Sequence, residues 1–474
     1  MHEIALSANE LLTALLALAP ARRVQILDSG GARGEDEARF LIAGFDPFET
    51  VEAQGDQLTV WRREGNTTEH VRWDVLALLD EQLAHRRTSV ANTPSLTLPG
   101  AGIASFSYNL ARRFLRLRST QPRSAEPPEP DATLAFFDTL VIHDYARGTT
   151  HIGGARVEET RVALLEAAHR ADETAARHKT PEVFKERAVK RAVNSNFTRA
   201  EYLAAVERIR AHIYAGDIYQ ANLTQQLTCP LAKGDGAEQV FLRLRRDHPA
   251  SFAAFLRRAS DTVVSASPER FLRVAVDAQT GERRVEAWPI KGTRPRGTNA
   301  AEDERLRAEL LASEKDRAEN TMIVDLLRND LGRVCRYGSI EVAELCALQE
   351  HPTLFHLVSK VRGTLRSEVS ASELLRATFP CGSITGAPKL RAMEIIDEVE
   401  TTPRGLSMGA IGYFSFDGAI DLNVAIRTMV VRDGAARFNV GGGIVADSDP
   451  ASEYEESLVK ARALLRALRA DNGR

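Results

Sequence analysis

Two pairs of acidic residues, each pair three positions apart, are spaced to share one face of a helix. The first pair is Asp316 and Glu319, whose face continues through apolar residues to Leu326, so both carboxylates extend an inward-facing stripe. The second pair is Glu453 and Glu456, near the C-terminus. Burying unpaired carboxylates is costly, so a cation should meet them. Two such pairs could supply oxygen ligands to Mg²⁺, partly through water.

Each pair also has a simpler explanation, as a helix cap or as an ion-pair set within one helix. Glu456 with Lys460, one turn later, is an example. The presence of two pairs favours the metal. Lys291, placed between Ile290 and Gly292 in the segment Trp-Pro-Ile-Lys-Gly-Thr, adds a cation to the same half of the chain.

Two glycine-containing segments are suited to binding an anion. Thr385 lies in Gly-Ser-Ile-Thr-Gly-Ala-Pro-Lys, which leads into an expected helix with Pro388 as its first residue, and backbone amides at a helix N-terminus attract anions. Residues 441–443 are three glycines expected to follow a strand, where a ligand can approach the backbone closely. Arg427, expected within a strand at 424–431, could pair with a carboxylate. These motifs together predict an enzyme for a small, doubly negative substrate.

Composition excludes several classes of protein. A formal net charge of -3 leaves no basic surplus for nucleic acid. No stretch of about 18 apolar residues predicts a membrane span, and the N-terminus does not resemble a signal peptide. The four cysteines have no metal-ligand spacing, which favours reduced thiols and a cytoplasmic location. Neither phosphate-loop nor dinucleotide-binding motifs occur.

Three segments are expected along the chain: 1–150, a helix and connector at 151–196, and a catalytic region at 197–466. A strand at 134–142 is expected to form a hairpin with one at 149–152, and strands 262–266 and 271–276 are expected to form another. Thr198 and Glu201 form a capping box that predicts a helix to about residue 215. Antiparallel strands mixed with helices favour an α+β fold.

Several of these motifs, in this order, resemble the chorismate-binding enzymes, a family that includes anthranilate, isochorismate and salicylate synthases. The resemblance is dense over about residues 195–466 and weaker over 1–150. It rests on five segments: residues 289–293, 316–330, 382–389, 409–413 and 441–446.

The resemblance implies two orthogonally packed antiparallel sheets sandwiched by helices, with the active site in the cleft between them. It implies Mg²⁺ bound by Glu319 and Glu456, supported through water by Asp316 and Glu453, and holding the ring carboxylate of chorismate. It also implies several contacts to the substrate, from Thr385, Tyr413, Arg427, Gly442, Gly443, Lys460 and His356. On sequence alone, His356 in an apolar run would more often be a core residue.

Two positions indicate which reaction the family resemblance implies. Members that add water carry a lysine base where this chain has Gln220, and glutamine cannot deprotonate water. Lys291 matches a lysine proposed as a nucleophile in members that aminate chorismate with ammonia to 4-amino-4-deoxychorismate, on the route to p-aminobenzoate and folate. Glu269 matches the family's general acid. A carboxylate clamp or a surface position remains an alternative for Lys291.

The remaining implications concern partners and alternatives. No glutaminase-like cysteine is present, so ammonia is expected from solution or from a separate glutamine amidotransferase subunit. Ser29 lies in a segment resembling the family's tryptophan-binding effector site. Anthranilate formation with release of pyruvate is the alternative reaction, and a non-catalytic effector-binding homologue is the alternative class. Retention of Glu269, Lys291 and the acidic pairs counts against the latter.

Overall fold

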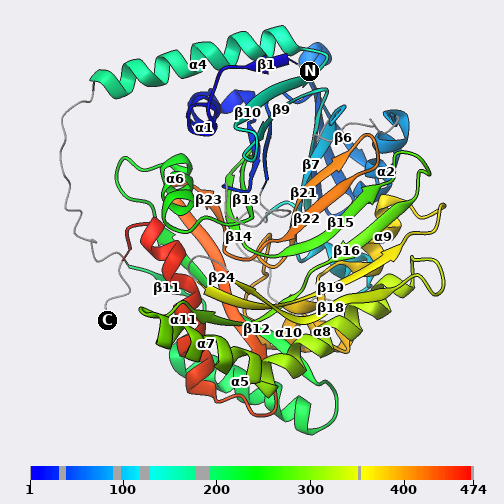
Figure 1. Cartoon of the computed structure of the whole chain (residues 1–474), viewed down its shortest axis with the longest axis vertical. Coiled ribbons are helices and arrows are strands. Elements are labelled where there is room, and N and C mark those ends of the chain that lie inside the picture. The colour runs from blue at the N-terminus through cyan, green and yellow to red at the C-terminus, as the bar shows by residue number, and fades with distance from the viewer. Residues whose placement is uncertain are drawn as a thin grey trace.

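The computed structural model describes residues 2–30, 39–88, 98–117, 129–177, 192–350 and 354–470. Two large antiparallel sheets dominate it, with helices packed around them (Figure 1). The α+β prediction is therefore confirmed. Among the described residues, no helix is long and apolar enough to span a membrane.

The first sheet combines strands from both halves of the chain. Its order is β1 (His2–Ile4), β10 (Thr149–Gly154), β9 (Thr139–Asp144), β3 (Phe40–Gly44), β2 (Gln25–Asp28), β13 (Phe252–Arg257), β14 (Thr262–Ser267), β23 (Thr428–Arg432), β24 (Ala435–Ile444), β12 (Gln220–Pro230) and β11 (Asn194–Ser195), with β20 (Gly386–Ala387) also on β12.

The second sheet is built in the same way. Its order is β17 (Ile290–Pro295), β19 (Leu354–Thr364), β16 (Arg283–Ala287), β15 (Arg270–Val276), β22 (Ile420–Val424), β21 (Ala410–Ser415), β7 (Ala101–Phe106), β8 (Ala132–Phe137), β4 (Glu49–Gln54), β5 (Gln57–Arg62) and β6 (Thr67–Arg72), with β18 (Glu341–Glu350) also on β19.

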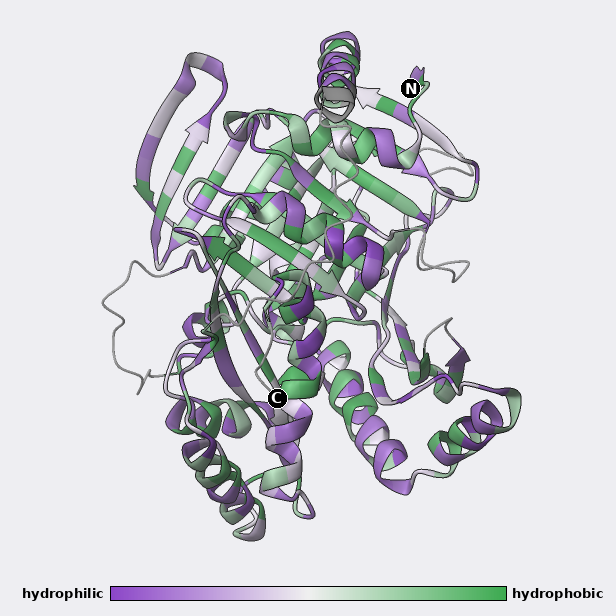
Figure 2. Cartoon of the chain, turned by 90° about the vertical axis from the view of Figure 1, so that its left-hand side faces the viewer, coloured by the Kyte–Doolittle hydropathy of each residue, from purple (hydrophilic) through white to green (hydrophobic). Residues whose placement is uncertain are grey.

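Helices cover the outer face of each sheet, and apolar residues fill three layers (Figure 2). On the first sheet pack α1 (Ala8–Ala17), α4 (Val157–Arg177), α6 (Ala237–Asp247) and α11 (Pro450–Ala467). On the second pack α2 (Val75–His85), α3 (Leu110–Phe114), α8 (Glu314–Gly332) and α9 (Ala371–Thr378). Between the sheets lies a third cluster, which includes Ile142, Leu256, Ile103 and Ile411.

Three further helices surround the ends of the sheets: α5 (Arg199–Tyr214), α7 (Ala300–Ala312) and α10 (Lys389–Val399). Helix α5 begins as predicted, because the Thr198 hydroxyl accepts a hydrogen bond from the Glu201 amide and the Glu201 carboxylate accepts one from the Thr198 amide. The helix predicted after residue 151 is α4, and most of the predicted connector lies outside the described residues.

The described chain passes between the two sheets six times, and four of these crossings form two matched pairs, one pair in each half of the chain. In the first half, β3 leads to β4 in the second sheet and β8 returns to β9 in the first. In the second half, β14 leads to β15 and β22 returns to β23. Because β4 pairs with β8 and β15 pairs with β22, the two crossings of each matched pair begin and end on neighbouring strands.

These crossings overturn two of the expected strand arrangements. The predicted strand 134–142 is two strands, β8 and β9, in different sheets, although β9 does form the hairpin with β10. Strands β14 and β15 do not form a hairpin, because Ser267 and Pro268 carry the chain into the other sheet. The Ser267 hydroxyl donates to the Val424 carbonyl oxygen at 2.6 Å, which ties this crossing to its neighbour.

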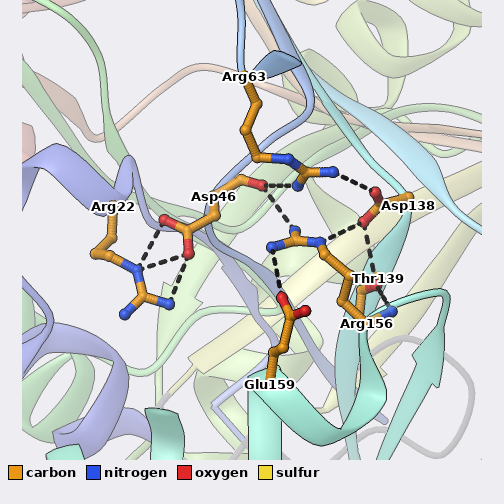
Figure 3. Close-up of polar contacts among 7 residues, drawn as sticks. All are labelled: Arg22, Asp46, Arg63, Asp138, Thr139, Arg156 and Glu159. Carbon is orange, nitrogen blue, oxygen red and sulfur yellow. Dashed lines mark hydrogen bonds and ion pairs between the residues drawn. The ribbon is translucent and has the colours of Figure 1, made fainter. Parts of the chain in front are cut away.

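Ion pairs hold the two crossings of the first half together (Figure 3). Arg63 and Arg156 each donate to the Asp46 carbonyl oxygen at 2.8 Å, and each also contacts the Asp138 carboxylate. Arg22 pairs with the Asp46 side chain at 2.6 Å. Burial raises the pKa of Asp138, but the two guanidinium groups outweigh it and leave that pKa below its ordinary value.

Candidate active site

Glu269 lies at the crossing from β14 to β15, between the two sheets. Its side chain is buried, and the Ser383 hydroxyl and the Ile290 amide lie close enough to its carboxyl group to affect its pKa. Oε1 has no hydrogen-bond partner in the described part of the chain. Burial raises the pKa of Glu269 to about 7, while Ser383, Lys291 and the Ile290 amide partly offset that rise. A carboxyl group with this pKa is suited to donating a proton near neutral pH.

Lys291 lies on β17, next to the Ile290 amide that contacts Glu269. Its Nζ lies 3.9 Å from Glu319 Oε2, and only 15 % and 16 % of these two side chains are exposed. Gly292 allows this approach: it has φ +87°, and a Cβ on it would lie 3.0 Å from the Asp316 Cβ. The glycine therefore brings the lysine strand close to the acidic helix α8.

The four acidic residues lie at the starts of α8 and α11 and have different partners. Asp316 lies 3.3 Å from Arg294 Nη2, and Glu453 accepts a 2.6 Å hydrogen bond from Ser448. Glu456 lies 2.7 Å from Lys460, so the predicted alternative of an ion pair within the helix is realised there.

Their pKa values differ in direction. Burial raises the pKa of Glu453 above its ordinary value, although Ser448 opposes the rise. Burial acts in the same direction on Glu456, but Lys460, Lys315 and Lys291 outweigh it and lower that pKa. Lys291 therefore interacts electrostatically with carboxylates from both helices, Glu319 of α8 and Glu456 of α11.

Gly442 marks the space that the second acidic pair shares. A Cβ on Gly442 would lie 3.3 Å from Glu453 Oε2, 3.5 Å from Lys460 Nζ and 3.6 Å from Glu456 Oε1. Carboxylate oxygens beside a glycine that leaves this space open are chemically suited to Mg²⁺. No group of three or more metal-ligating side chains is close enough for one ion in the ranges described.

The glycine triplet does not follow a strand as expected, because it is part of β24 and pairs with β12. This close pairing requires glycine, because a Cβ on Gly441 would lie 1.8 Å from the Leu223 carbonyl oxygen of β12. Lys460 Nζ donates to the Gly441 carbonyl oxygen at 3.0 Å.

Gln220 is the first residue of β12, and its side-chain amide lies against Gly443 of β24. It is fully buried, and neither its amide nitrogen nor its amide oxygen has a hydrogen-bond partner among the described residues. A Cβ on Gly443 would lie 2.5 Å from Gln220 Nε2. A buried amide without a partner is costly, so this group is placed to meet a ligand.

Residues 381–387 form a buried turn that faces Glu269. The Thr385 hydroxyl donates to the carbonyl oxygens of Cys381 and Gly382, so its hydrogen bonds stabilise the turn. Pro388 is the N-cap of α10 and not its first residue as predicted, because its ψ of 141° is extended. Lys389 contacts Asp330 at 2.5 Å and two carbonyl oxygens before the turn.

Arg427 lies between β22 and β23 and not inside a strand, at the crossing from the second sheet to the first. Its φ is +48°, and its carbonyl oxygen accepts a hydrogen bond from the Ala266 amide at 3.0 Å. Burial lowers the pKa of Arg427. His356 is buried on β19, where its Nδ1 lies 2.8 Å from the Thr293 hydroxyl.

Tyr413 and Ser29 lie together in a different cavity, of about 130 Å³, that is also lined by Phe40 and Asp421. Neither Glu269 nor any residue of the acidic pairs lines that cavity. Burial and the Asp421 carboxylate raise the pKa of Tyr413. The structure thus groups Tyr413 with the predicted effector residue.

Two residues near the site were not predicted from the sequence. Ser383 contacts the Glu269 carboxyl group across the two motifs, and no sequence signal indicates which motif a turn serine faces. Lys315 lies next to Asp316 on α8. Its charge acts to lower the pKa of both Glu453 and Glu456, although burial leaves the pKa of Glu453 raised. Its position beside an acidic pair was the available signal.

Comparison with known proteins agrees with this geometry. The family model described as chorismate binding enzyme matches residues 26–466. Aminodeoxychorismate synthase component 1 of Klebsiella aerogenes is 39 % identical over 430 residues, covering 91 % of this chain and 90 % of the relative. Anthranilate synthase component 1 of Synechocystis sp. is 37 % identical over 463 residues, covering 92 % and 89 %.

A solved structure shows the same fold. Anthranilate synthase component I from Streptococcus pneumoniae TIGR4 superimposes with a TM-score of 0.72 at 28 % identity, covering 91 % of this chain and 95 % of that one. The family match spans both halves and all the residues placed around Glu269 and Lys291, so this chain belongs to the family of chorismate binding enzymes.

Proposed function

We propose that this chain aminates chorismate with ammonia to give 4-amino-4-deoxychorismate and water. The observation that carries the proposal is the placement of Lys291 beside Glu269, a buried carboxyl group whose pKa is raised to about 7. The relative from Klebsiella aerogenes, named aminodeoxychorismate synthase component 1, supports it. Gln220, which cannot act as a base toward water, supports amination over hydration.

In this mechanism, Lys291 and Glu269 carry out a double displacement. The neutral amine of Lys291 forms a bond to C2 of the ring, a ring double bond shifts, and the C4 hydroxyl leaves as water with a proton from Glu269. Ammonia then forms a bond to C4 and the C2–N bond breaks. The lysine departs as the neutral amine with which it began, keeping its own two protons, and the proton lost by the ammonium at C4 restores Glu269. The amino group therefore arrives at the carbon that lost the hydroxyl.

The substrate's two carboxylates require positive or hydrogen-bonding partners. Arg427, partly buried at the sheet crossing, is suited to one carboxylate. Lys460 and the open space at Gly442 are suited to the other. Both groups would hold the ring against Glu269 and Lys291, and His356 with its Thr293 hydrogen bond would form a wall of the site.

We propose Mg²⁺ as the cofactor, held by Glu319 and Glu456 and supported by Asp316 and Glu453. It would supply positive charge for the ring carboxylate. Replacing Glu456 by Gln should lower Mg²⁺ affinity and turnover by roughly tenfold or more, with an unchanged melting temperature. Calorimetric Mg²⁺ titration and rate measurements check this.

Glu455→Gln is the matched control, since Glu455 is a neighbour on α11 that lines a different cavity. Full activity in excess chelator would refute the metal assignment.

We propose that ammonia comes from a separate glutamine amidotransferase subunit, in keeping with the "component 1" in the relatives' names. The isolated chain should turn over chorismate with ammonium at alkaline pH, where NH₃ is abundant, and should be inert with glutamine. Rates with each nitrogen source, measured on the purified chain, test this. Turnover with glutamine alone would contradict it.

Anthranilate synthesis is the second candidate, favoured by the 37 % identity to the Synechocystis protein. That reaction releases pyruvate, whereas amination at C4 keeps the side chain. A coupled pyruvate assay with chorismate, ammonium and Mg²⁺ separates the two reactions.

A further inference from the structure

The guanidinium group of Arg404 occupies a fully buried position between two walls of the site, with only 1 % of its side chain exposed. It follows α10 and pairs with Glu400 through two hydrogen bonds, at 2.9 Å and 2.7 Å. Its other two hydrogen bonds go to the backbone. It donates to the Ile384 carbonyl oxygen at 2.9 Å and to the Asn222 carbonyl oxygen at 2.5 Å.

Those two carbonyl oxygens belong to the segments that face the reacting groups. Ile384 follows Ser383, whose hydroxyl contacts the Glu269 carboxyl group. Asn222 lies two residues after Gln220, whose amide has no partner among the described residues. A direct bond also joins the segments, since the Asn222 amide donates to the Thr385 carbonyl oxygen at 2.7 Å.

Glu400 extends the same network into β12. Its Oε1 accepts hydrogen bonds from both the amide and the hydroxyl of Thr224, each at 2.8 Å. The Arg404 side chain also lies 4.5 Å from the ring centre of Tyr108. A planar fork with donors in fixed directions can meet Glu400, Ile384 and Asn222 at once, whereas a lysine ammonium cannot.

We propose that Arg404, neutralised by Glu400, is a positioning residue that fixes the turn at 382–385 against β12 and thereby holds Ser383 on Glu269. The proposal rests on the proposed function for the role of Glu269, but the geometry it describes does not. A misplacement of about 1 Å in such a support is enough to cost roughly 10²-fold in rate.

Among the described residues, four groups face the Glu269 carboxyl group. They are Ser383 and the Cys381 thiol from the turn, and Lys291 and the Ile290 amide from β17. The Ser383 hydroxyl acts to lower the pKa of Glu269, so moving it away should raise that pKa. Arg404→Lys should therefore move the titration of Glu269 to higher pH, lower kcat by about tenfold or more, and change KM little.

Infrared titration of the Glu269 carboxyl band, identified by its absence in Glu269→Gln, measures this without any turnover. Failure of the proposed reaction would thus leave the test intact. Ser383→Ala should give the same upward movement without disturbing the ion pair. Arg258→Lys is the matched control, because Arg258 is a buried arginine whose side chain pairs with Asp261, away from this turn, with side chains 2 % and 0 % exposed.

An unchanged Glu269 titration in Arg404→Lys, or an equal movement in Arg258→Lys, would overturn the proposal. Loss of the folded state in Arg404→Lys alone would also count against it, because Arg404 would then serve folding as a whole.

Discussion

Lys291→Arg should abolish formation of aminodeoxychorismate, with kcat lower by at least roughly 10³-fold, while chorismate still binds. Arginine keeps the positive charge near Glu319 but stays protonated and cannot attack carbon as an amine. A lysine that only held a carboxylate by charge would tolerate this change. Steady-state rates with mass-spectrometric detection of product, together with chorismate titration, separate the two roles.

Lys360→Arg provides the matched control for this prediction. Lys360 lies on β19, pairs with Glu344 at 2.9 Å and lies 4.6 Å from the ring centre of Trp288, close to the lysine segment. Its replacement should leave the rate unchanged. Near-normal product from Lys291→Arg would refute the covalent step and would leave the family membership untouched.

Glu269→Gln should lower kcat by about 10²–10⁴-fold, because an amide cannot give a proton to the departing hydroxyl. The pH dependence follows from the raised pKa of about 7. The acid form that donates the proton is present below that pKa and is lost above it. At a fixed concentration of free NH₃, the rate of the unmodified chain divided by that of Glu269→Gln should therefore fall as pH rises through about 7, since this ratio removes the pH effect that both chains share through the Lys291 amine.

Glu269→Gln supplies the reference rate for this ratio because its amide does not titrate. Glu49→Gln is a suitable control, since Glu49 is also buried but pairs with Arg62 on β5. A ratio that stays constant between pH 6 and 9 at fixed NH₃ would remove Glu269 from the role of general acid.

The sequence predicted those parts of the fold that local chemistry determines. The capping box at Thr198 predicted the start of α5, and the mixture of strands and helices predicted the class. The six sheet crossings were not predictable. An extended segment keeps the same alternation of apolar residues whether it stays in one sheet or passes into another, so residues 134–142 looked like one strand.

The same distinction between local and long-range features applies to the residues of the candidate site. Asp316, Glu319, Glu453 and Glu456 could be recognised because their spacing within one helix is a local property. The contact of Ser383 with Glu269 and the contacts of Arg404 with two backbone segments join residues that are distant in sequence. Arg427 was placed in a strand because its neighbours are apolar, whereas the chain turns there with a positive φ to change sheets.

The account is tested most directly by identifying the product formed from chorismate, ¹⁵N-labelled ammonium and Mg²⁺ by the purified chain. Mass spectrometry should show chorismate with its hydroxyl replaced by a ¹⁵N amino group and its enolpyruvyl side chain retained, without pyruvate in solution. Labelled anthranilate with an equal amount of pyruvate would contradict amination at C4, and unchanged chorismate would contradict catalysis by this chain.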